Sequence, residues 1–283
     1  MSIDTTWLQS QFPELTTIQP LNVGGQKSVF TADHENHGRI VLKLFHLGTD
    51  VQRAMREVEA VSEIQSSRVP KILHVGDKSS PTGRVMWVWE SYIEGETLRE
   101  MLIRRRMETH EILTLGMHIL EALDAAEKVR IVHRDVKPEN IMVGSDGSGW
   151  LLDFGLARHL DRNSLTVTGP FTGVVGTPGY SPPEQFNNQK PDQDSRTDLF
   201  ALGVTLYECI EGNNPYRAGA RDPYEMLRRI ETDDLPRISR KLDAQDSLGD
   251  LILSMTRRQR NHRPRTVQEA LGWIRDVCPL PAV

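Results

Sequence analysis

The spacing of apolar residues divides the chain into a β-rich part and a helical part. In the first part, β-branched and aromatic residues form short runs separated by turn residues, at 28–32, 39–45, 72–76 and 84–89. The last two runs flank the sequence GDKSSPTG, which we interpret as a turn. Segment 51–65 instead has apolar residues at helical spacing. These patterns predict a mostly antiparallel sheet accompanied by one helix.

From Thr97 onward, apolar residues recur every three or four positions, as amphipathic helices require. We expect helices at 98–107, 110–129, 197–212, 222–231, 247–258 and 266–276. Residues 131–184 are irregular, apart from short apolar runs at 141–143 and 150–154.

The predicted fold class is therefore α+β and bilobal, with a small antiparallel β-sheet lobe that carries one helix and a larger, mostly helical lobe. The small lobe is expected at 15–90 and the large lobe at 91–277, with the joint near 90–95. Residues 1–14 are predicted to be an N-terminal extension, and residues 278–283 a C-terminal tail.

Composition narrows the class of protein. The 283 residues carry a formal net charge of −5, which gives no reason to expect nucleic-acid binding. Segment 199–210 is apolar but too short to span a bilayer, and the N-terminus lacks a basic stretch before an apolar run. The distant residues Cys209 and Cys278 favour thiols over a disulfide. We therefore predict a soluble cytoplasmic protein without a membrane segment.

The segment 133–140, HRDVKPEN, concentrates ionisable groups beside apolar sequence. Asp135 lies in a loop that Pro138 stiffens, and such a carboxylate can accept a proton from an attacking hydroxyl. Lys137 could neutralise an anionic group beside it. The amide oxygen of Asn140 could bind a hard cation.

Two further positions carry candidate chemistry. Asp153 follows an apolar strand in LLDFG, so that Asp153 and Asn140 together form a plausible Mg²⁺ site. Lys43 lies inside an apolar strand, where a lysine requires a counter-ion, and Glu57 on the following helix is the expected partner. Each feature alone has an ordinary interpretation: a lysine at a sheet edge, an aspartate in a turn, or a charged surface loop.

The order of these features resembles the eukaryotic-type serine/threonine protein kinases, over about Leu15 to Val277. That family combines a strand lysine, a helix glutamate, HRD-x-x-x-x-N and DFG. GTPGYSPPE, at 176–184, resembles the family's peptide-positioning loop and its Ala-Pro-Glu segment. The compact loops resemble bacterial members.

The resemblance implies a role for each motif residue. Asp135 orients and deprotonates the acceptor hydroxyl, and Lys137 stabilises the transferred phosphoryl group. Lys43, fixed by Glu57, binds the α- and β-phosphates of ATP. Asn140 and Asp153 hold Mg²⁺, for which Mn²⁺ could substitute.

Other matched positions imply structural and selective roles. His133 and Phe154 belong to an internal stack of side chains. Asp198 braces the catalytic loop, and Arg263 pairs with Glu184. Lys137 and Thr177 favour serine and threonine over tyrosine in the protein substrate.

The chain departs from the family in its glycine-rich loop, where the family has G-x-G-x-x-G-x-V and this chain has NVGGQKSV at 22–29. Asn22 and Lys27 replace the first and third glycines. Lys27 either hinders the approach of phosphate to the backbone or contacts phosphate through its ammonium, and we favour contact. The implied nucleotide-binding residues here are Leu21, Asn22, Gly24, Gly25, Lys27 and Val29.

The predicted adenine site also departs from the family. Glu90 stands where a hydrophobic residue usually closes the adenine pocket, so the back of the pocket would be unusually polar. A shift of one residue in the strand register would move Glu90 away. The residues from Ser91 to Ile93 are expected to supply backbone hydrogen bonds to adenine.

Several alternatives remain at this stage. The altered glycine-rich loop could indicate a pseudokinase that acts as a scaffold, and related folds include small-molecule kinases. The second alternative conflicts with GTPGYSPPE, because small-molecule kinases have no use for a peptide-positioning loop. Besides protein substrates we expect a regulatory protein partner. The sequence does not specify the oligomeric state.

Other charged clusters are weaker signals. His34 and His37 could suggest a metal pair, but a hydrated hairpin turn is favoured. Arg104–Arg106 and the group Arg257, Arg258 and Arg260 are expected on hydrated surfaces, with a dock for acidic substrates as the alternative.

Phosphorylation of the activation segment, residues 153–184, is the predicted form of regulation. Arg134 precedes the catalytic aspartate, and in the family this arginine often binds a phosphate on that segment. The candidate acceptors are Thr166, Thr168 and Thr172. We expect autophosphorylation at Thr168 or Thr172, because the added negative charge would pair with arginine. Intact-mass analysis after incubation with ATP should show added phosphate; an unchanged mass in an active enzyme would contradict this expectation.

Overall fold

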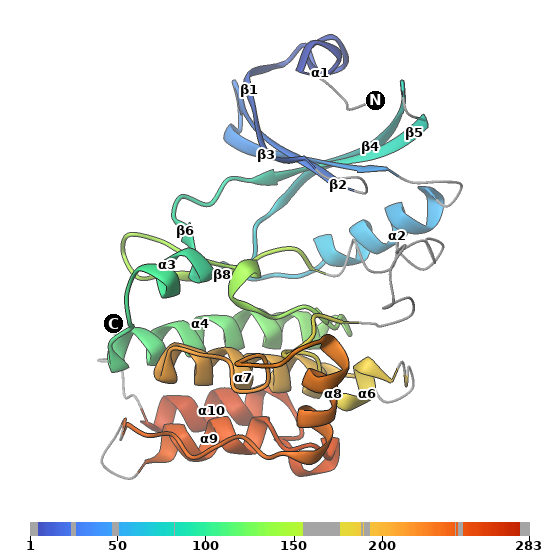
Figure 1. Cartoon of the computed structure of the whole chain (residues 1–283). Helices are drawn as coiled ribbons and strands as arrows, with labels where there is room; N and C mark the ends of the chain where they lie inside the picture. Colours follow the sequence, from blue (N-terminus) through green and yellow to red (C-terminus); the bar gives the residue numbers. More distant parts are fainter. Residues whose placement is uncertain are drawn as a thin grey trace. The chain divides into compact units, whose positions relative to one another are not determined.

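The computed structural model describes residues 5–23, 27–46, 51–81, 83–154, 176–187, 189, 193–240, 242 and 246–277. The chain divides into two compact units, which are described separately (Figure 1). The first unit contains the described residues of 1–64 and 70–93. The second contains 65–69 and the described residues from Glu94 onward.

The first unit is built on a five-stranded antiparallel sheet with strand order β1-β2-β3-β5-β4. Its strands are β1 (Leu15–Val23), β2 (Lys27–His34), β3 (Gly38–His46), β4 (Ile72–Ser80) and β5 (Gly83–Ser91). Its helices are α1 (Thr5–Gln11) and α2 (Val51–Ser62). The predicted antiparallel sheet and the helix after Lys43 are therefore confirmed, whereas α1 was not expected.

The predicted turn GDKSSPTG is wrong over most of its length. Strand β4 continues to Ser80, and Asp77 pairs with Met86 in the ladder with β5. The Asp77 carboxylate also binds the guanidinium of Arg84, with a shortest distance of 2.6 Å. Turn-forming residue types did not end the strand because pairing with β5 satisfies their backbone groups.

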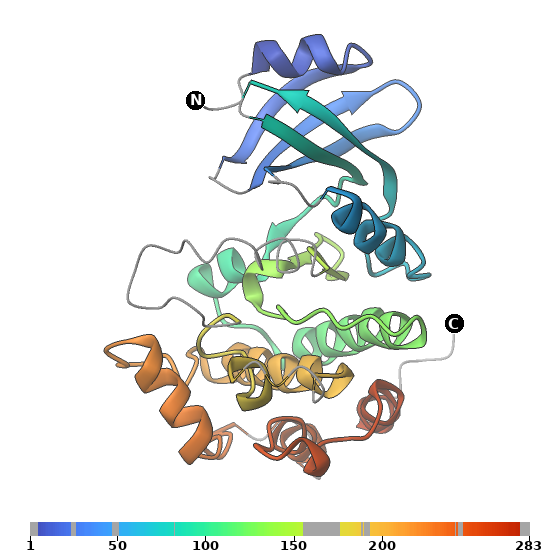
Figure 2. The same cartoon turned by 90° about the vertical axis from the view of Figure 1, so that its right-hand side faces the viewer.

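Alternation along the strands gives the sheet two apolar faces. Ile40, Leu42 and Leu44 of β3 join one buried cluster, together with Leu8 of α1 and Phe12 just after it. The other face packs against α2 through a second cluster, made of Phe45, Ala54, Val58, Met86 and Val88. Figure 1 and Figure 2 show α1 and α2 on opposite faces of the sheet.

Most of the N-terminal extension is thus part of the core of the first unit. Leu8 and Phe12 are both fully buried. The ring of Phe12 lies 5.2 Å from the ring of Trp87, in an edge-on arrangement. The ammonium of Lys78 lies 3.9 Å above the Phe12 ring and also donates a hydrogen bond to the carbonyl of Gln11.

The second unit consists mainly of helices. They are α3 (Leu98–Arg104), α4 (Thr109–Lys128), α6 (Pro183–Phe186), α7 (Ser195–Glu211), α8 (Pro223–Thr232), α9 (Ser247–Met255) and α10 (Val267–Val277), with 3₁₀ turns η1 (Pro138–Asn140) and η4 (Arg260–His262). Helix α4 contacts α7 and α10, and α7 contacts α9. In the described part of the chain, no helix combines the length and apolar character needed to cross a bilayer.

Helix α7 is the central element of this unit, and nearly every residue in it is buried. This burial explains the apolar segment noted in the sequence. The side chain of Asp194 caps the first turn by accepting a hydrogen bond from the backbone N–H of Arg196. The helix ends at Gly212, whose φ of 79° suits a left-handed cap.

A small sheet holds the loop that carries the catalytic motif. It contains β6 (Glu96–Thr97), β7 (Ile141–Val143) and β8 (Gly149–Leu151) in that order. Turn η1 runs directly into β7, and Leu152 follows β8. The backbone N–H of Leu152 donates to the carbonyl of Asn140, so the two motif segments lie side by side.

Removing the Phe12 side chain should destabilise the protein. Because Phe12 is fully buried, Phe12→Ala should lower the free energy of unfolding by about 3–5 kcal/mol. Denaturant titration followed by tryptophan fluorescence measures the change. Ser10→Ala, at an exposed position of the preceding helix α1, is the control and should change the free energy by less than about 0.5 kcal/mol. Equal, small effects would contradict a structural role for this segment.

Candidate active site

The predicted catalytic loop, residues 133–140, is held by one buried carboxylate. Asp198 of α7 is 2% exposed, and its two oxygens accept hydrogen bonds from the backbone N–H groups of His133 and Arg134, both at 2.7 Å. Bonds to an ionised acceptor are stronger than those between neutral groups. The bracing contact expected from the sequence is present.

Two motif residues have left-handed backbone conformations that are unusual for residues with side chains. Arg134 has a φ of 65°, and Asp153 has a φ of 59°. Such conformations cost about 1–3 kcal/mol each and persist where surrounding contacts over-determine them. The bond from the Arg134 N–H to Asp198 and the bond from the Gln185 side chain to the Arg134 carbonyl, at 2.8 Å, supply such contacts.

His133 is fixed in a single tautomer by its neighbours. Its Nδ1 accepts a hydrogen bond from the backbone N–H of Asp135 at 3.1 Å, so the ring proton resides on Nε2. That nitrogen lies 2.7 Å from the carbonyl oxygen of Leu152. The His133 ring also lies 4.6 Å from the ring of Phe154, and both residues are buried. The predicted stacking of these two side chains is thus present.

The Asp135 carboxylate lies at the centre of a polar group. Its Oδ1 accepts a hydrogen bond from the hydroxyl of Thr177 at 2.6 Å. Its Oδ2 lies 2.9 Å from the ammonium of Lys137, and that ammonium also donates to the Thr177 hydroxyl at 3.0 Å. An aliphatic hydroxyl is therefore bound by the proposed base and the proposed phosphate-binding lysine together.

Asn140 and Asp153 fit a magnesium site. The Asn140 side-chain nitrogen donates to the Asp135 backbone carbonyl at 2.8 Å and to its carboxylate at 3.0 Å. This use of the nitrogen leaves the amide oxygen as the atom suited to bind a cation. One amide oxygen and the Asp153 carboxylate are hard oxygen donors of the kind that Mg²⁺ accepts. Across the described residues, no group of three or more His, Cys, Asp or Glu is arranged to hold a metal.

Lys43 forms an ion pair with Glu90, the residue that the sequence pattern placed at the adenine pocket. Its ammonium lies 2.5 Å from the carboxylate of Glu90, and both side chains are at least nine-tenths buried. The two residues lie on neighbouring strands β3 and β5, which explains why sequence distance concealed the contact. The pairing of Lys43 with Glu57 on α2 stays a prediction.

The structure describes part of the predicted nucleotide-binding segment. Leu21 and Asn22 lie on β1 and are exposed, and Asn22 pairs with Val29 of β2, the strand that begins at Lys27. Gly24 and Gly25 lie outside the described residues.

Ser91 ends β5, and its backbone N–H donates to the carbonyl of Lys71 at 2.9 Å. The predicted adenine contact of Ser91 therefore depends on its carbonyl group. The predicted role of Ile93 stays a prediction. The threonines proposed for phosphorylation, Thr166, Thr168 and Thr172, lie outside the described residues.

Helix α6 is held by a buried ion pair. Glu184 binds Arg263 through two contacts, at 2.6 and 3.1 Å, and the Arg263 side chain is fully buried. Arg263 also donates to the backbone carbonyls of Arg196, Arg257 and Arg258. The pair predicted from the sequence is present and joins α6 to the segment around η4.

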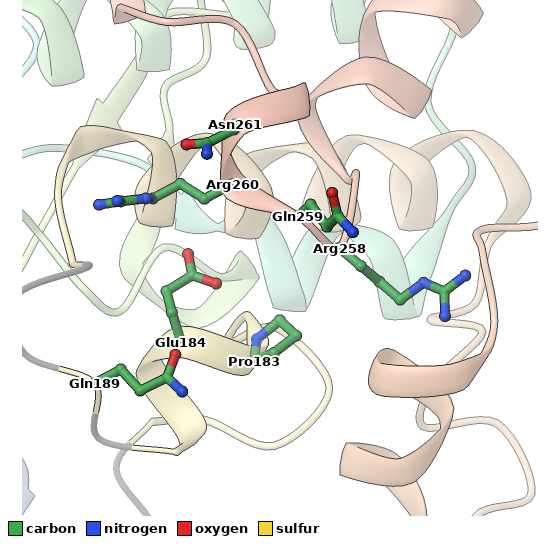
Figure 3. Close-up of a pocket in the computed structure, with 7 residues that line it drawn as sticks. All are labelled: Pro183, Glu184, Gln189, Arg258, Gln259, Arg260 and Asn261. Carbon is green, nitrogen blue, oxygen red and sulfur yellow. The ribbon is translucent and has the colours of Figure 1, made fainter.

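Figure 3 shows a polar pocket beside this ion pair, lined by Pro183, Glu184, Gln189, Arg258, Gln259, Arg260 and Asn261. The side chains of Arg258 and Arg260 extend in different directions there. Arg258 donates to the Glu231 carbonyl, and Arg260 binds the Asp194 carboxylate at 3.1 Å. These arginines bind the protein's own groups, and the choice between a hydrated surface and a dock for acidic substrates stays a prediction. The lining residues of this pocket do not include the predicted catalytic or metal-binding residues.

The histidine pair has a neighbour that the sequence did not reveal. The rings of His34 and His37 lie 4.7 Å apart, and the ring of His74, from β4, lies 5.4 Å from that of His37. His37 and His74 are exposed. The cluster forms on the sheet surface through strand pairing, which local sequence spacing cannot show.

A polar network beside the catalytic loop was also missed. Arg99 of α3 binds Glu139 of η1 at 3.0 Å, Glu208 of α7 at 2.7 Å and the hydroxyl of Tyr180 at 2.6 Å. Burial, and then the nearby Glu208 carboxylate, raise the pKa of Tyr180, so its hydroxyl remains protonated and donates to Glu208. The network ties η1 to the segment 176–184, and its members come from α3, η1, α7 and that segment.

Breaking the buried ion pair should be strongly destabilising. Arg263→Met leaves the Glu184 carboxylate buried without its guanidinium and should lower the free energy of unfolding by about 3–5 kcal/mol. Arg258→Met is the control, because its contact with Asp234 is exposed and should contribute less than about 1 kcal/mol. Chemical denaturation compares the two variants. A loss in Arg263→Met no larger than in the control would rule out a stabilising role for the buried pair.

Comparison with known proteins agrees with the geometry. The protein kinase domain model matches residues 16–272. A probable serine/threonine-protein kinase of Clostridium perfringens is 29% identical over 234 residues, covering 82% of this chain and 33% of that protein. Probable serine/threonine-protein kinase PknB of Bifidobacterium longum is 33% identical over 210 residues, covering 70% and 30%.

Serine/threonine-protein kinase PknL of Mycobacterium tuberculosis is 35% identical over 188 residues, covering 66% of this chain and 44% of that protein. The chain therefore spans less than half the length of these bacterial relatives. The family match covers nearly all of the chain and agrees with the braced catalytic loop and the buried ion pair. The chain belongs to the protein kinase domain family.

Proposed function

We propose that this protein transfers the γ-phosphoryl group of ATP to serine and threonine hydroxyls of protein substrates. The observation that carries the proposal is the arrangement in which Asp135 and Lys137 together bind the hydroxyl of Thr177. The same two groups suit an incoming aliphatic hydroxyl of similar size. The relatives' names, as serine/threonine-protein kinases, support the same activity.

Asp135 is proposed to act as the base. Its carboxylate already accepts a hydrogen bond from an alcohol at 2.6 Å, a distance within reach for proton transfer. Hydrogen bonds from Asn140 and Lys137 keep its other oxygen in a fixed direction. The substrate hydroxyl would replace the Thr177 hydroxyl, give its proton to Asp135 and attack the γ-phosphorus, while the bond from that phosphorus to the β–γ bridging oxygen breaks and ADP leaves.

The remaining site residues are proposed to bind the phosphates and to hold the metal ion that neutralises their charge. Lys137 stabilises the transferred phosphoryl group, and Lys43 holds the α- and β-phosphates. Asn140 and Asp153 would hold Mg²⁺, or Mn²⁺ in its place, and the bound ion supplies positive charge that neutralises the phosphates. Glu57 is proposed to orient Lys43 from α2. Because little covalent work is needed from the protein, placement and electrostatics dominate the catalysis.

The nucleotide is proposed to contact the segment Leu21–Val29, including Asn22, Gly24, Gly25 and Lys27, together with the backbone of Ser91 and Ile93. Arg134 would bind a phosphate on the activation segment. The protein is expected to act on other proteins and to receive its signal through a regulatory partner. We propose a cytoplasmic location, which suits an enzyme that consumes ATP. The buried free thiol of Cys209 agrees with a reducing compartment.

Replacing the proposed base tests the activity. Asp135→Asn keeps the shape of the side chain but cannot accept a proton at this step, so phosphate transfer should fall by about 10²–10⁴-fold. Radiolabelled ATP, Mg²⁺ and a generic basic protein provide the assay. Asp146→Asn is the matched control, because Asp146 is an exposed turn residue whose carboxylate accepts hydrogen bonds from Ser148 of the same turn, and it should keep wild-type activity.

The same assay separates the alternatives. A wild-type protein that binds ATP without labelling protein would be a scaffold rather than a kinase. Labelling of a small molecule but not of protein would indicate a small-molecule kinase. Equal labelling of protein by wild type and Asp135→Asn would exclude the proposed role of Asp135.

A further inference from the structure

A buried carboxylate shares the lysine that is proposed to bind phosphate. In the ladder between β3 and β5, Lys43 pairs with Val88 and Val41 pairs with Glu90. Lys43 and Glu90 therefore lie on the same face of the sheet, one diagonal step apart. The ammonium and the carboxylate are 2.5 Å apart, and their side chains are 6% and 9% exposed.

Apolar surroundings strengthen the attraction between the Lys43 ammonium and the Glu90 carboxylate. The same sheet face presents Phe45, Met86 and Val88, and α2 covers it with Ala54 and Val58. In such apolar surroundings water screens the charges weakly, so each charge depends on the other. The contact is also fixed by strand register, because both residues belong to central paired strands of the sheet.

We propose that Glu90 is a positioning residue for Lys43 that also lowers the positive charge available to phosphate. This inference rests on the proposed function, in which Lys43 binds the α- and β-phosphates. An ammonium has three N–H donors, so Lys43 can bind Glu90 and a phosphate oxygen together. The carboxylate then repels the phosphate that the ammonium attracts, and the site binds triphosphate less tightly than an uncompensated lysine would.

The proposal gives Glu90 a role different from the wall of an adenine pocket. A wall residue would affect every ligand that contains adenine, whether or not the ligand carries phosphate. A charge shared with Lys43 affects only ligands whose phosphates reach the ammonium. The ratio of triphosphate affinity to nucleoside affinity therefore distinguishes the two roles.

Glu90→Gln removes the charge while it keeps the side-chain shape and an oxygen that can accept from Lys43. We expect this variant to bind a non-hydrolysable ATP analogue with Mg²⁺ at least about fivefold more tightly than wild type. This factor is the lower end of the usual effect of one bound group on the affinity for another. Adenosine should bind equally to both proteins. Isothermal titration calorimetry on the full chain measures the four affinities.

Three more variants complete the design. Glu90→Asp retains the charge and should not gain triphosphate preference. Glu90→Met suits the apolar neighbours and removes the charge, so it should shift the preference in the same direction as Glu90→Gln. Asp77→Asn is the matched control on β4, because Asp77 also pairs with a cation, Arg84, but outside the proposed site, and it should leave both affinities unchanged. Thermal unfolding identifies variants that fold, and Glu90→Met decides the test if Glu90→Gln does not fold.

The results separate this inference from the proposed function. The role of Glu90 alone is overturned if wild-type protein binds the analogue and phosphorylates protein while the charge-removing variants keep the wild-type affinity ratio. The same holds if those variants bind the triphosphate more weakly. Equal changes for adenosine and for the triphosphate assign Glu90 to the adenine wall and also overturn it. Wild-type protein that binds neither ligand and transfers no phosphate overturns the proposed function itself.

Discussion

The carboxylate of Asp198 is the contact on which the catalytic loop depends. It accepts two backbone hydrogen bonds at 2.7 Å from consecutive residues, His133 and Arg134, and one of these residues has a left-handed backbone. A loop alone would not hold that conformation, since it is strained for a residue with a side chain. Because Asp198 projects from the buried helix α7, the rigidity of the apolar core is passed directly to the residues around Asp135.

In the first unit a sheet, rather than a helix, holds the charged residues in place. Its two faces each bury an apolar cluster, so any charged residue that points inward must meet its counter-charge on the same face. Lys43 and Glu90 meet this condition because strands β3 and β5 pair with matching alternation. The N-terminal helix α1 covers the opposite face, where Leu8 and Phe12 take part in the core. The lysine thus lies on a strand held between two ladders, on the sheet face that packs against α2.

Sequence reasoning succeeded where chemistry is local and failed where strand pairing sets it. Asp135, Lys137 and Asn140 lie within one short loop, so their contacts could be predicted from spacing and from the family motif. The partner of Arg263 was also expected, but only through resemblance. The contact between Lys43 and Glu90 was instead missed, because nothing local shows that residues 43 and 90 share one sheet face, and the place of Glu90 at the adenine pocket stays a prediction. Helix α1 and the longer strand β4 were missed for the same reason, since packing and pairing outweighed weak local preferences.

Both lysines proposed to bind phosphate are already in contact with a carboxylate. Lys137 lies 2.9 Å from Asp135, and Lys43 lies 2.5 Å from Glu90. Each pair is close to neutral as a whole, so these two lysines add little net positive charge for a triphosphate that carries several negative charges. The remaining charge must be balanced by cations that arrive with the nucleotide, and the oxygen donors of Asn140 and Asp153 suit that requirement. Under the proposed function, phosphate binding would therefore depend on the metal, and each lysine is already held by its own carboxylate.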